Sequence, residues 1–419
     1  MKRRVLIIGG GIIGLSTAYY CVRRGWEVTV VERGSAQRDV CAFQNAGMVV
    51  PSHFIPLAAP GMVALGLKWM WNPESPFCIK PRASARLLGW LWKFWRAATP
   101  QRVRRAAPLL RDLNLASRAL YEELAATIGN DFGLVKNGLL MLCQTQQGLD
   151  EEAKIAAQAV ALGLPVQVLD ARQTAALDPQ VRMSVAGSVY FPKDCHLQPD
   201  RLLAALQARL VAAGVQFLWD SEVTGWRQGS GCRLQAVCLA GGRELPAEEY
   251  VLCGGSWSPG IVRELGLKLP LQAGKGYSLT LPRPRQLPQI CAILTEARLA
   301  VTPMGGALRF GGTLEISGLN HDINPARVRG IINAVPGYYP DFTPADFDGL
   351  RPWCGLRPCS PDGLPYLGRS GMFSNLTLAT GHAMMGMSLG PITGSLVAGI
   401  ISGDRSQMDL SLLSPDRYN

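Results

Sequence analysis

The beginning of the chain carries the pattern that most constrains its fold, because it predicts strand, glycine turn, helix, strand and acid in that order. Residues 5–8 are apolar and rich in β-branched side chains, which is typical of a buried strand. The run Gly9-Gly10-Gly11-Ile12-Ile13-Gly14 follows directly, and residues 12–22 predict a helix. Residues 27–31 predict a second strand with Glu32 at its end. This is the order of a βαβ unit that binds an adenine dinucleotide.

Each glycine of this turn has a separate task in such a unit. Gly9 allows the tight turn, Gly11 lets the backbone approach a pyrophosphate, and Gly14 lets helix and strand pack closely. The helix N-terminus offers its N–H groups and positive dipole end to the phosphates. Glu32 is placed to accept hydrogen bonds from the adenosine ribose. The alternative is a glycine-rich turn in another α/β fold. We expect dinucleotide contacts from Gly9, Gly11, Ile12, Ile13, Gly14, Glu32 and Arg33.

Later segments predict that the nucleotide-binding domain is discontinuous in sequence. Residues 215–219 and 250–253 are short apolar strands, and the second runs into a pair of glycines. Residues 376–380 predict another strand, followed by a glycine-rich turn at 381–386 and a helix at 389–402. A strand, turn and helix therefore stand near each end of the chain.

The whole pattern predicts an α/β fold, and 419 residues are enough for two domains. Residues 271–281, 297–303 and 308–315 alternate in polarity around glycine turns and predict a separate antiparallel sheet. Residues 350–368 are rich in proline and predict a loop. We assign residues 1–50, 145–258 and 340–419 to a discontinuous Rossmann-type domain, and residues 51–144 and 259–339 to a substrate domain of antiparallel sheet and helices.

Residues 66–111 differ from the rest of the chain in charge and in tryptophan content. They hold ten Lys or Arg against one acid, Glu74, and five of the ten tryptophans: Trp69, Trp71, Trp90, Trp92 and Trp95. Basic residues beside Trp, Leu and Phe are typical of a segment that lies in a membrane interface. The alternative is a pair of substrate-domain helices with core tryptophans and a solvated basic face.

Composition excludes several other classes of protein. No run of 18 or more apolar residues lacks a charge, so we expect no membrane-spanning helix. The eleven cysteines show no paired CxxC spacing and suggest reduced cytosolic thiols. None of the four histidines is spaced as a metal pair, so we expect no metal site. No nucleic-acid module is present, despite a net charge of +11. We expect a cytoplasmic protein, with peripheral contact to the inner face of a membrane as an option.

Four sequence blocks resemble those of the D-amino-acid oxidase and glycine oxidase superfamily of FAD enzymes. They are Gly9 to Gly14 with Glu32; Gly254-Gly255-Ser256-Trp257; Gly355-Leu356-Arg357-Pro358 with Pro361-Asp362-Gly363; and Thr380-Gly381-His382 ahead of Gly386 and Gly390. Three further stretches resemble bacterial D-amino-acid dehydrogenases: Lys275-Gly276-Tyr277-Ser278-Leu279-Thr280, Asn45-Ala46-Gly47 and Leu67-Lys68-Trp69-Met70. One stretch departs from the family, because Cys41-Ala42-Phe43-Gln44 stands where Ser or Thr is usual.

The resemblance implies that FAD lies between the first glycine turn and the turn at Gly381. It also implies flavin contacts from Asn45, Ala46, Gly47, Met48, Val223, Gly254, Gly381, His382, Gly386 and Met387. Some amine oxidases of this superfamily attach FAD to a cysteine in the region of Cys354 and Cys359. The spacing here does not match, so we expect non-covalent FAD.

The resemblance further implies oxidation of D-amino or cyclic imino acids, with electrons passed to a quinone or another acceptor that is not oxygen. Docking of residues 66–111 on a membrane would suit a membrane quinone as that acceptor. Arg357 is the matching position for the residue that binds the substrate carboxylate, and its planar fork suits that task. Tyr277 could donate a second hydrogen bond to the same carboxylate, and His53 could face the flavin. Each has a structural alternative: a salt bridge for Arg357, a core-edge tyrosine and a buried histidine.

Two other functions stay open at this point. One is an amine oxidase of the glycine, sarcosine or hydroxyproline type that uses oxygen. The other is a flavin-binding subunit or redox sensor without turnover. The presence of Arg357 argues against the sensor, because a sensor needs no carboxylate-binding residue.

Overall fold

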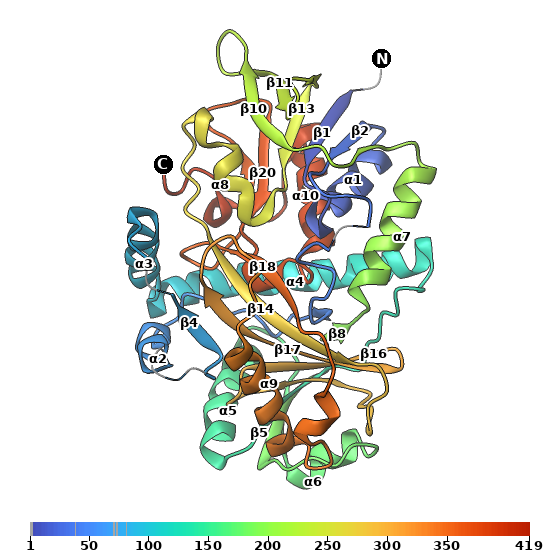
Figure 1. The fold of residues 1–419 in the computed structure, drawn as a ribbon, viewed down its shortest axis with the longest axis vertical. Helices are drawn as coiled ribbons and strands as arrows, with labels where there is room; N and C mark the ends of the chain where they lie inside the picture. The colour runs from blue at the N-terminus through green and yellow to red at the C-terminus, as the bar shows by residue number, and fades with distance from the viewer. Residues whose placement is uncertain (1–2, 38, 70–71, 73, 81) are drawn as a thin grey trace.

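The computed structural model describes residues 3–37, 39–69, 72, 74–80 and 82–419 (Figure 1). Two sheets lie at opposite ends of the long axis, and the long helix α4 (Pro100–Ile128) runs across the middle of the molecule. Met70 and Trp71, which belong to the basic, tryptophan-rich residues 66–111, lie outside the described residues. The α/β fold predicted from the sequence is confirmed.

The smaller sheet is the nucleotide-binding sheet that the glycine turn predicted. It has six strands in the order β19-β20-β13-β1-β2-β9. All neighbours are parallel except the edge strand β19, which is antiparallel to β20. Its strands are β1 (Arg4–Ile8), β2 (Glu27–Val31), β9 (Gln216–Leu218), β13 (Glu249–Leu252), β19 (Tyr366–Arg369) and β20 (Leu376–Thr380). Strands from both ends of the chain therefore meet in one sheet.

Helices from both ends of the chain also pack together on this sheet. These are α1 (Ile12–Arg23) and α10 (Gly390–Ser402), with α7 (Pro199–Ala212) beside α1. A Cβ on Gly394 would lie 2.5 Å from the backbone of Ser16, so only glycine lets the two helices approach this closely.

The larger sheet has nine strands, in the order β18-β14-β17-β16-β15-β5-β7-β6, with β4 paired to β17. The three segments predicted as antiparallel strands form β14, β17 and β16, and their pairing is antiparallel. Its strands are β4 (Phe77–Ile79), β5 (Leu139–Cys143), β6 (Gln167–Asp170), β7 (Gly187–Phe191), β14 (Gln272–Leu281), β15 (Cys291–Leu294), β16 (Leu299–Met304), β17 (Ala307–Ile316) and β18 (Trp353–Cys359).

Three of these strands correct the sequence analysis. β6 and β7 were assigned with residues 145–258 to the nucleotide domain, but β7 pairs with β5 in the larger sheet. Periodicity identifies a strand but not the sheet that it joins. β18 replaces part of the loop predicted at 350–368 and also joins the larger sheet. It is an edge strand, where a proline such as Pro358 is tolerated.

The remaining elements connect and cover these two sheets. A three-stranded sheet of β10, β11 and β12 and a short pair of β3 and β8 complete the strands in the described ranges. The strands are β3 (Met48–Val49), β8 (Cys195–His196), β10 (Val223–Gln228), β11 (Leu234–Leu239) and β12 (Glu244–Pro246). The helices are α2 (Met62–Trp69), α3 (Ala85–Ala97), α5 (Gln146–Ala161), α6 (Ala171–Leu177), α8 (Ser258–Ile261) and α9 (Pro325–Tyr338).

Candidate active site

A large open cavity lies where the six-stranded sheet meets β18 of the nine-stranded sheet. The empty space between its walls is about 1560 Å³, and part of this space is open to solvent. All four sequence blocks contribute to its wall, although they are far apart in the chain. Ligand sites of parallel α/β sheets lie outside the carboxyl ends of the strands, and β1, β2, β13 and β20 end at this cavity. The geometry therefore fits one extended ligand that touches all four blocks.

The glycine turn after β1 is shaped as expected for a pyrophosphate. Gly9 has φ +109°, and a Cβ there would meet the Cys253 carbonyl oxygen at 2.5 Å. A Cβ on Gly14 would lie 1.8 Å from the Gly9 carbonyl oxygen, which explains its role in helix packing. Around Gly11 no atom lies within 4 Å of a Cβ position in the described chain, so its backbone faces open space in the cavity wall. The turn therefore leaves open space beside Gly11 in which a diphosphate can lie against the backbone.

Glu32 is held at the end of β2 by two backbone amides. The N–H of Gly10 donates to Glu32 Oε2 at 2.7 Å, and that of Gly34 donates to Oε1 at 2.9 Å. The neighbouring guanidinium of Arg33 lies over the ring of Trp257, 3.7 Å from its centroid. These residues line the cavity on the side of the first glycine turn, which is the side expected for the adenosine.

Twelve of the seventeen residues expected to contact the cofactor line this cavity. They are Gly9, Gly11, Ile12, Ile13, Glu32, Arg33, Asn45, Val223, Gly254, His382, Gly386 and Met387. The other five are not among the lining residues: Gly14, Ala46, Gly47, Met48 and Gly381. Gly381 has φ +78°, and a Cβ there would touch the ring of Tyr366 at 2.8 Å. Its glycine is therefore required by the turn and by packing.

Arg357 lines the cavity from β18. Its Nη1 donates to the Thr313 carbonyl oxygen at 2.6 Å, and among the described residues no carboxylate forms an ion pair with it. Burial lowers the pKa of this guanidinium, while the thiol of Cys41 acts in the opposite direction. Arginine stays protonated in proteins, so the cavity wall holds a positive charge. Arg357 is only partly buried, and a ligand carboxylate would supply an anion for it inside the cavity.

Tyr277 is not among the residues that line this cavity. Its side chain is buried, its hydroxyl donates to Glu315 Oε2 at 2.9 Å, and it accepts from the Asn324 amide at 3.3 Å. Burial and the bond to Glu315 raise the pKa of the phenol. This geometry is that of the core-edge tyrosine that the sequence analysis kept as the alternative.

His53 and His382 occupy different positions relative to the cavity. His53 does not line the cavity, and its Nδ1 lies 3.0 Å from Ser52 Oγ, which in turn donates to Asp194 Oδ2. Burial lowers the pKa of His53 to about 4. His382 does line the cavity, its Nε2 is 3.0 Å from Thr393 Oγ1, and burial lowers its pKa to about 3. Both imidazoles are therefore neutral near pH 7.

The cavity wall also contains residues that no motif indicated as a site. His321, in the loop after β17, stacks on Trp257 with ring centroids 6.4 Å apart. Asp39 accepts from Trp353 Nε1 at 2.6 Å, which ties the loop after β2 to β18. Trp257 belongs to the block Gly254-Gly255-Ser256-Trp257, so its closeness in sequence to Gly254 could have indicated that it lies at the cofactor site. Asp39 and His321 carried none, because their position depends on how the two sheets meet.

Comparison with known proteins gives a family for this cavity. Residues 4–400 match the family model described as DAO, FAD dependent oxidoreductase. The chain is 33% identical over 424 residues to a D-amino acid dehydrogenase of Allorhizobium ampelinum, covering 99% of this chain and 98% of the relative. It is 32% identical to a D-amino acid dehydrogenase of Rhizobium rhizogenes, covering 99% of this chain and 100% of the relative.

Solved structures agree with this similarity. The glycine oxidase of Geobacillus kaustophilus superposes with a TM-score of 0.80 and 25% identity, and each chain is covered completely. The L-proline dehydrogenase of P. horikoshii shares the fold, with a TM-score of 0.73 and 17% identity over 100% of this chain and 98% of the other. With its glycine cradle, ribose-side carboxylate and full-length relatives, the chain belongs to the DAO family of FAD-dependent oxidoreductases, and FAD is its cofactor.

Proposed function

We propose that this protein oxidises D-amino acids, or cyclic imino acids, to the corresponding imino compounds. The observation that supports this function is Arg357, a cation in the flavin cavity without a carboxylate partner among the described residues. The curated relatives quoted above carry the name D-amino acid dehydrogenase. An amino acid carboxylate is a planar anion that a guanidinium binds through two parallel hydrogen bonds.

The reaction needs orientation more than it needs acid or base groups. FAD, when bound, supplies the two-electron oxidant that takes a hydride from the substrate Cα. Arg357 holds the carboxylate and so fixes where Cα lies in the cavity. The neutral amine becomes an iminium ion as the hydride leaves, and for an open-chain amino acid water then converts the iminium ion to a 2-oxo acid and ammonium. Both neutral histidines are poor proton donors at pH 7, which suits a mechanism without a protonated imidazole.

An anaerobic screen tests this proposal directly. Purified holoenzyme is mixed without oxygen with D-, L- and cyclic amino acids, and loss of the flavin absorbance is followed. We expect bleaching with D-amino or cyclic imino acids and none with their L-enantiomers. Bleaching by L-amino acids alone would reverse the stereochemistry, and no bleaching by any of them would favour the redox sensor.

The second candidate is an amine oxidase that uses oxygen. The similarity to glycine oxidase favours it, since that structure is covered completely by this chain. Glycine, sarcosine and hydroxyproline also carry a carboxylate for Arg357. Hydrogen peroxide yield and reduction of a quinone dye, measured on one substrate in air, separate the two functions. We expect dye reduction with little peroxide.

We also propose that the electron acceptor is a membrane quinone, reached by peripheral docking through α3. Figure 1 shows α3 at the left edge of the molecule. Leu88, Trp92 and Trp95 are 65%, 52% and 62% exposed, and their spacing of four and three residues places them on one helix face. Arg96 lies over the Trp92 ring, 4.7 Å from its centroid, so cation and aromatic groups share this face. An interfacial helix combines these groups.

The inner face of α3 follows the alternative that the sequence analysis kept open. Trp90 is 3% exposed, and its indole N–H donates to the Cys359 carbonyl oxygen at 2.9 Å. The tryptophans of this helix are therefore divided between the core and the surface. No helix in the described ranges is long and apolar enough to cross a bilayer. The contact proposed for α3 is with the membrane surface, through the exposed face that carries Trp92 and Trp95.

A further inference from the structure

A bulge interrupts the pairing of β14 with β17 beside Arg357. Lys275 stands opposite Glu315 and Tyr277 opposite Gly312, so Gly276 faces two residues of β17, Thr313 and Leu314. Thr313 has φ +65°, which is the left-handed region. Glycine is the usual residue at such a position in a bulge, and a β-branched residue there is strained. Strain of this kind is retained where the surrounding structure over-determines it, often at functional sites.

The hydrogen bonds of Thr313 explain what the bulge achieves. Its carbonyl oxygen accepts from Arg357 Nη1 at 2.6 Å, and its Oγ1 accepts from the Tyr277 backbone N–H at 3.2 Å. The hydroxyl therefore ties the bulge to β14, and the carbonyl holds the guanidinium. Glycine would suit the backbone angle better, but it could not supply the hydroxyl. Threonine thus accounts for both contacts in one residue.

Gly276 lies on β14, the strand between β18 and β17, and it also contacts the Arg357 guanidinium. A Cβ on Gly276 would lie 2.2 Å from Arg357 Nη2 and 2.3 Å from Cζ and Nη1. The guanidinium therefore lies directly against the backbone of Gly276, and no other residue fits without moving it. Because Arg357 pairs with Gly274 across β14 and β18, its side chain runs diagonally over β14 to reach the bulge on β17.

We infer that Thr313 and Gly276 are positioning residues that orient the Arg357 guanidinium for the substrate carboxylate, an inference that rests on the proposed function. One of the five N–H donors of Arg357 is taken by the Thr313 carbonyl, and contact with Gly276 restricts the plane of the fork. A fork held in place before the substrate arrives loses less entropy on binding. These two residues therefore control carboxylate affinity without touching the substrate.

Thr313→Val is the main test, because it keeps size and shape but removes the hydroxyl that ties the bulge to β14. We expect the KM for the best D-amino acid to rise about tenfold, which corresponds to one lost or misaligned hydrogen bond to a charged group. The dissociation constant of propionate, a carboxylate without an amine, should rise by about the same factor. It is measured by titration of the flavin spectrum, while kcat and FAD content change little.

Thr313→Ser and Gly276→Ala extend the test if Thr313→Val folds poorly. Serine keeps the hydroxyl and removes the β-branch, so it should restore KM and propionate affinity to near the original values. Alanine at 276 must displace the guanidinium and should weaken propionate binding although Thr313 is unchanged. Thr302→Val on β16 is the matched control, because Thr302 is fully buried and its Oγ1 has no hydrogen-bond partner in the described chain.

The outcomes separate this inference from the proposed function. If Arg357→Leu leaves the KM and propionate affinity unchanged, the proposed role of Arg357 fails. If Arg357→Leu weakens both but Thr313→Val and Gly276→Ala leave propionate affinity unchanged, only the inference is overturned. A Thr313→Val protein with lower thermal stability but unchanged propionate affinity would also overturn it, because that result marks a purely structural role.

Discussion

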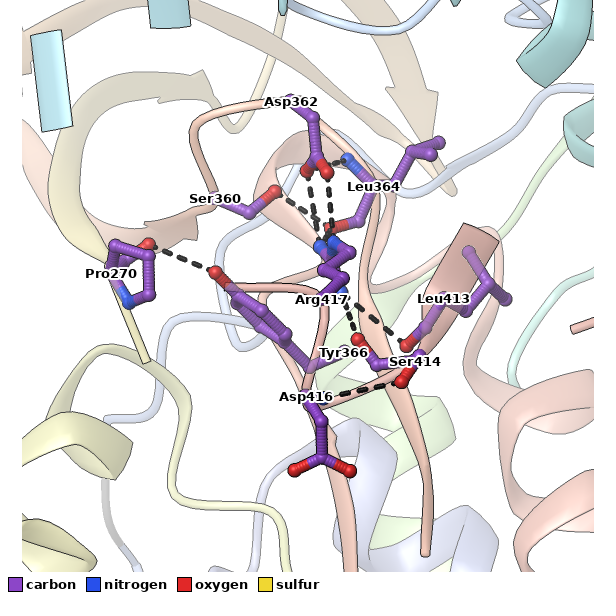
Figure 2. A network of polar contacts seen from close by, with 9 residues as sticks. All are labelled: Pro270, Ser360, Asp362, Leu364, Tyr366, Leu413, Ser414, Asp416 and Arg417. Atoms are coloured by element: carbon purple, nitrogen blue, oxygen red, sulfur yellow. Dashed lines mark hydrogen bonds and ion pairs between the residues drawn. The ribbon is translucent and has the colours of Figure 1, made fainter. Parts of the chain in front are cut away.

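Arg417 and Asp362 form a bidentate ion pair, in which Arg417 Nε and Nη2 donate to the two carboxylate oxygens at 2.8 and 3.1 Å (Figure 2). Their side chains are only 12% and 11% exposed. The same guanidinium donates to the carbonyl oxygens of Leu364 and Ser414 and lies 3.8 Å from the centroid of the Tyr366 ring. Asp362 belongs to the turn between β18, which bears Arg357, and β19, so the pair fastens that turn to the last residues of the chain.

Arg417→Met should therefore destabilise the protein strongly. Removal of one partner leaves the buried Asp362 carboxylate without its cation, at a cost of about 3–5 kcal/mol. The midpoint of thermal unfolding of the holoenzyme should fall clearly. Arg182→Met is the matched control, because Arg182 pairs with Asp341 at the surface and such pairs contribute about 0–1 kcal/mol. Equal midpoints for the two variants would refute the prediction.

Gly11→Val should give a folded protein without FAD. Apart from its own chain neighbours, no atom of the described chain lies within 4 Å of a Cβ at Gly11, so the new side chain would point into open space. It would instead fill the space left for the pyrophosphate. FAD content is measured by absorbance after denaturation, and folding by circular dichroism. Gly89→Ala in α3, which also meets open space, should keep its FAD. A yellow Gly11→Val protein would contradict this assignment.

Arg357→Leu should raise KM steeply while FAD stays bound. The lost hydrogen bonds to a charged carboxylate contribute about 1.5–3 kcal/mol each. Arg357→Lys should recover only part of the loss, because lysine lacks the planar fork. Steady-state kinetics with D-amino acids give the measurement. Arg351→Leu serves as control, since Arg351 is exposed and does not line the cavity. If Arg351→Leu raised KM more than Arg357→Leu, the carboxylate-binding role would be assigned to Arg351 instead.

How much of this site the sequence could predict depends on how local each requirement is. The need for Gly9, Gly11 and Gly14 arises from contacts within one strand–turn–helix unit. Their spacing alone therefore indicated a dinucleotide-binding turn. Glu32 follows from the same unit. The family resemblance then placed Arg357 on the cavity wall, although neither the resemblance nor periodicity showed that it lies on an edge strand. Local geometry and one specific motif were sufficient for these residues.

The failures share the opposite property, because they depend on pairing between distant strands. Tyr277 lies outside the cavity lining because β14 pairs with β17 in a register that brings Glu315 to its hydroxyl. The inferred role of Thr313 depends on a bulge in that pairing, where Thr313 bonds to Tyr277, a residue 36 positions earlier in the chain. β18 was missed because the prolines of residues 350–368 indicated a loop, whereas an edge strand tolerates a proline such as Pro358. The sequence pattern of one strand does not show which other strands pair with it, or in which register.

His196 should make the protein sensitive to mild acid. Burial lowers its pKa to about 4, and its Nδ1 has no hydrogen-bond partner in the described part of the chain. The unfolded chain takes up this proton near pH 6.5, before the folded state does, so the free energy of unfolding falls as pH drops from about 6.5 towards 4. His196→Leu should reduce that slope by up to about 1.4 kcal/mol per pH unit. Urea unfolding at several pH values gives the slope.

Asp194→Asn is the matched comparison for this experiment, with the opposite sign. Burial raises the pKa of Asp194 to about 7, so its folded form keeps a proton that the unfolded chain loses near pH 4. The free energy of unfolding due to this group therefore falls as pH rises from about 4 to 7. Asparagine should remove that contribution. If both variants changed the slope in the same direction, the assignment of these two groups would be wrong.

Docking through α3 should make the protein bind anionic vesicles at low salt. Basic residues near a membrane contribute about 1 kcal/mol each, and this attraction weakens as salt screens it. Trp92→Ser with Trp95→Ser should weaken binding further while the protein stays folded and FAD-loaded, because Trp90 still holds the inner face. Val160→Ser with Val211→Ser is the control, since these residues are 61% and 58% exposed on α5 and α7. The measurement is co-sedimentation with anionic and neutral vesicles. Equal binding by both double variants, or none to anionic vesicles at low salt, would return α3 to a solvated helix and favour oxygen as the acceptor.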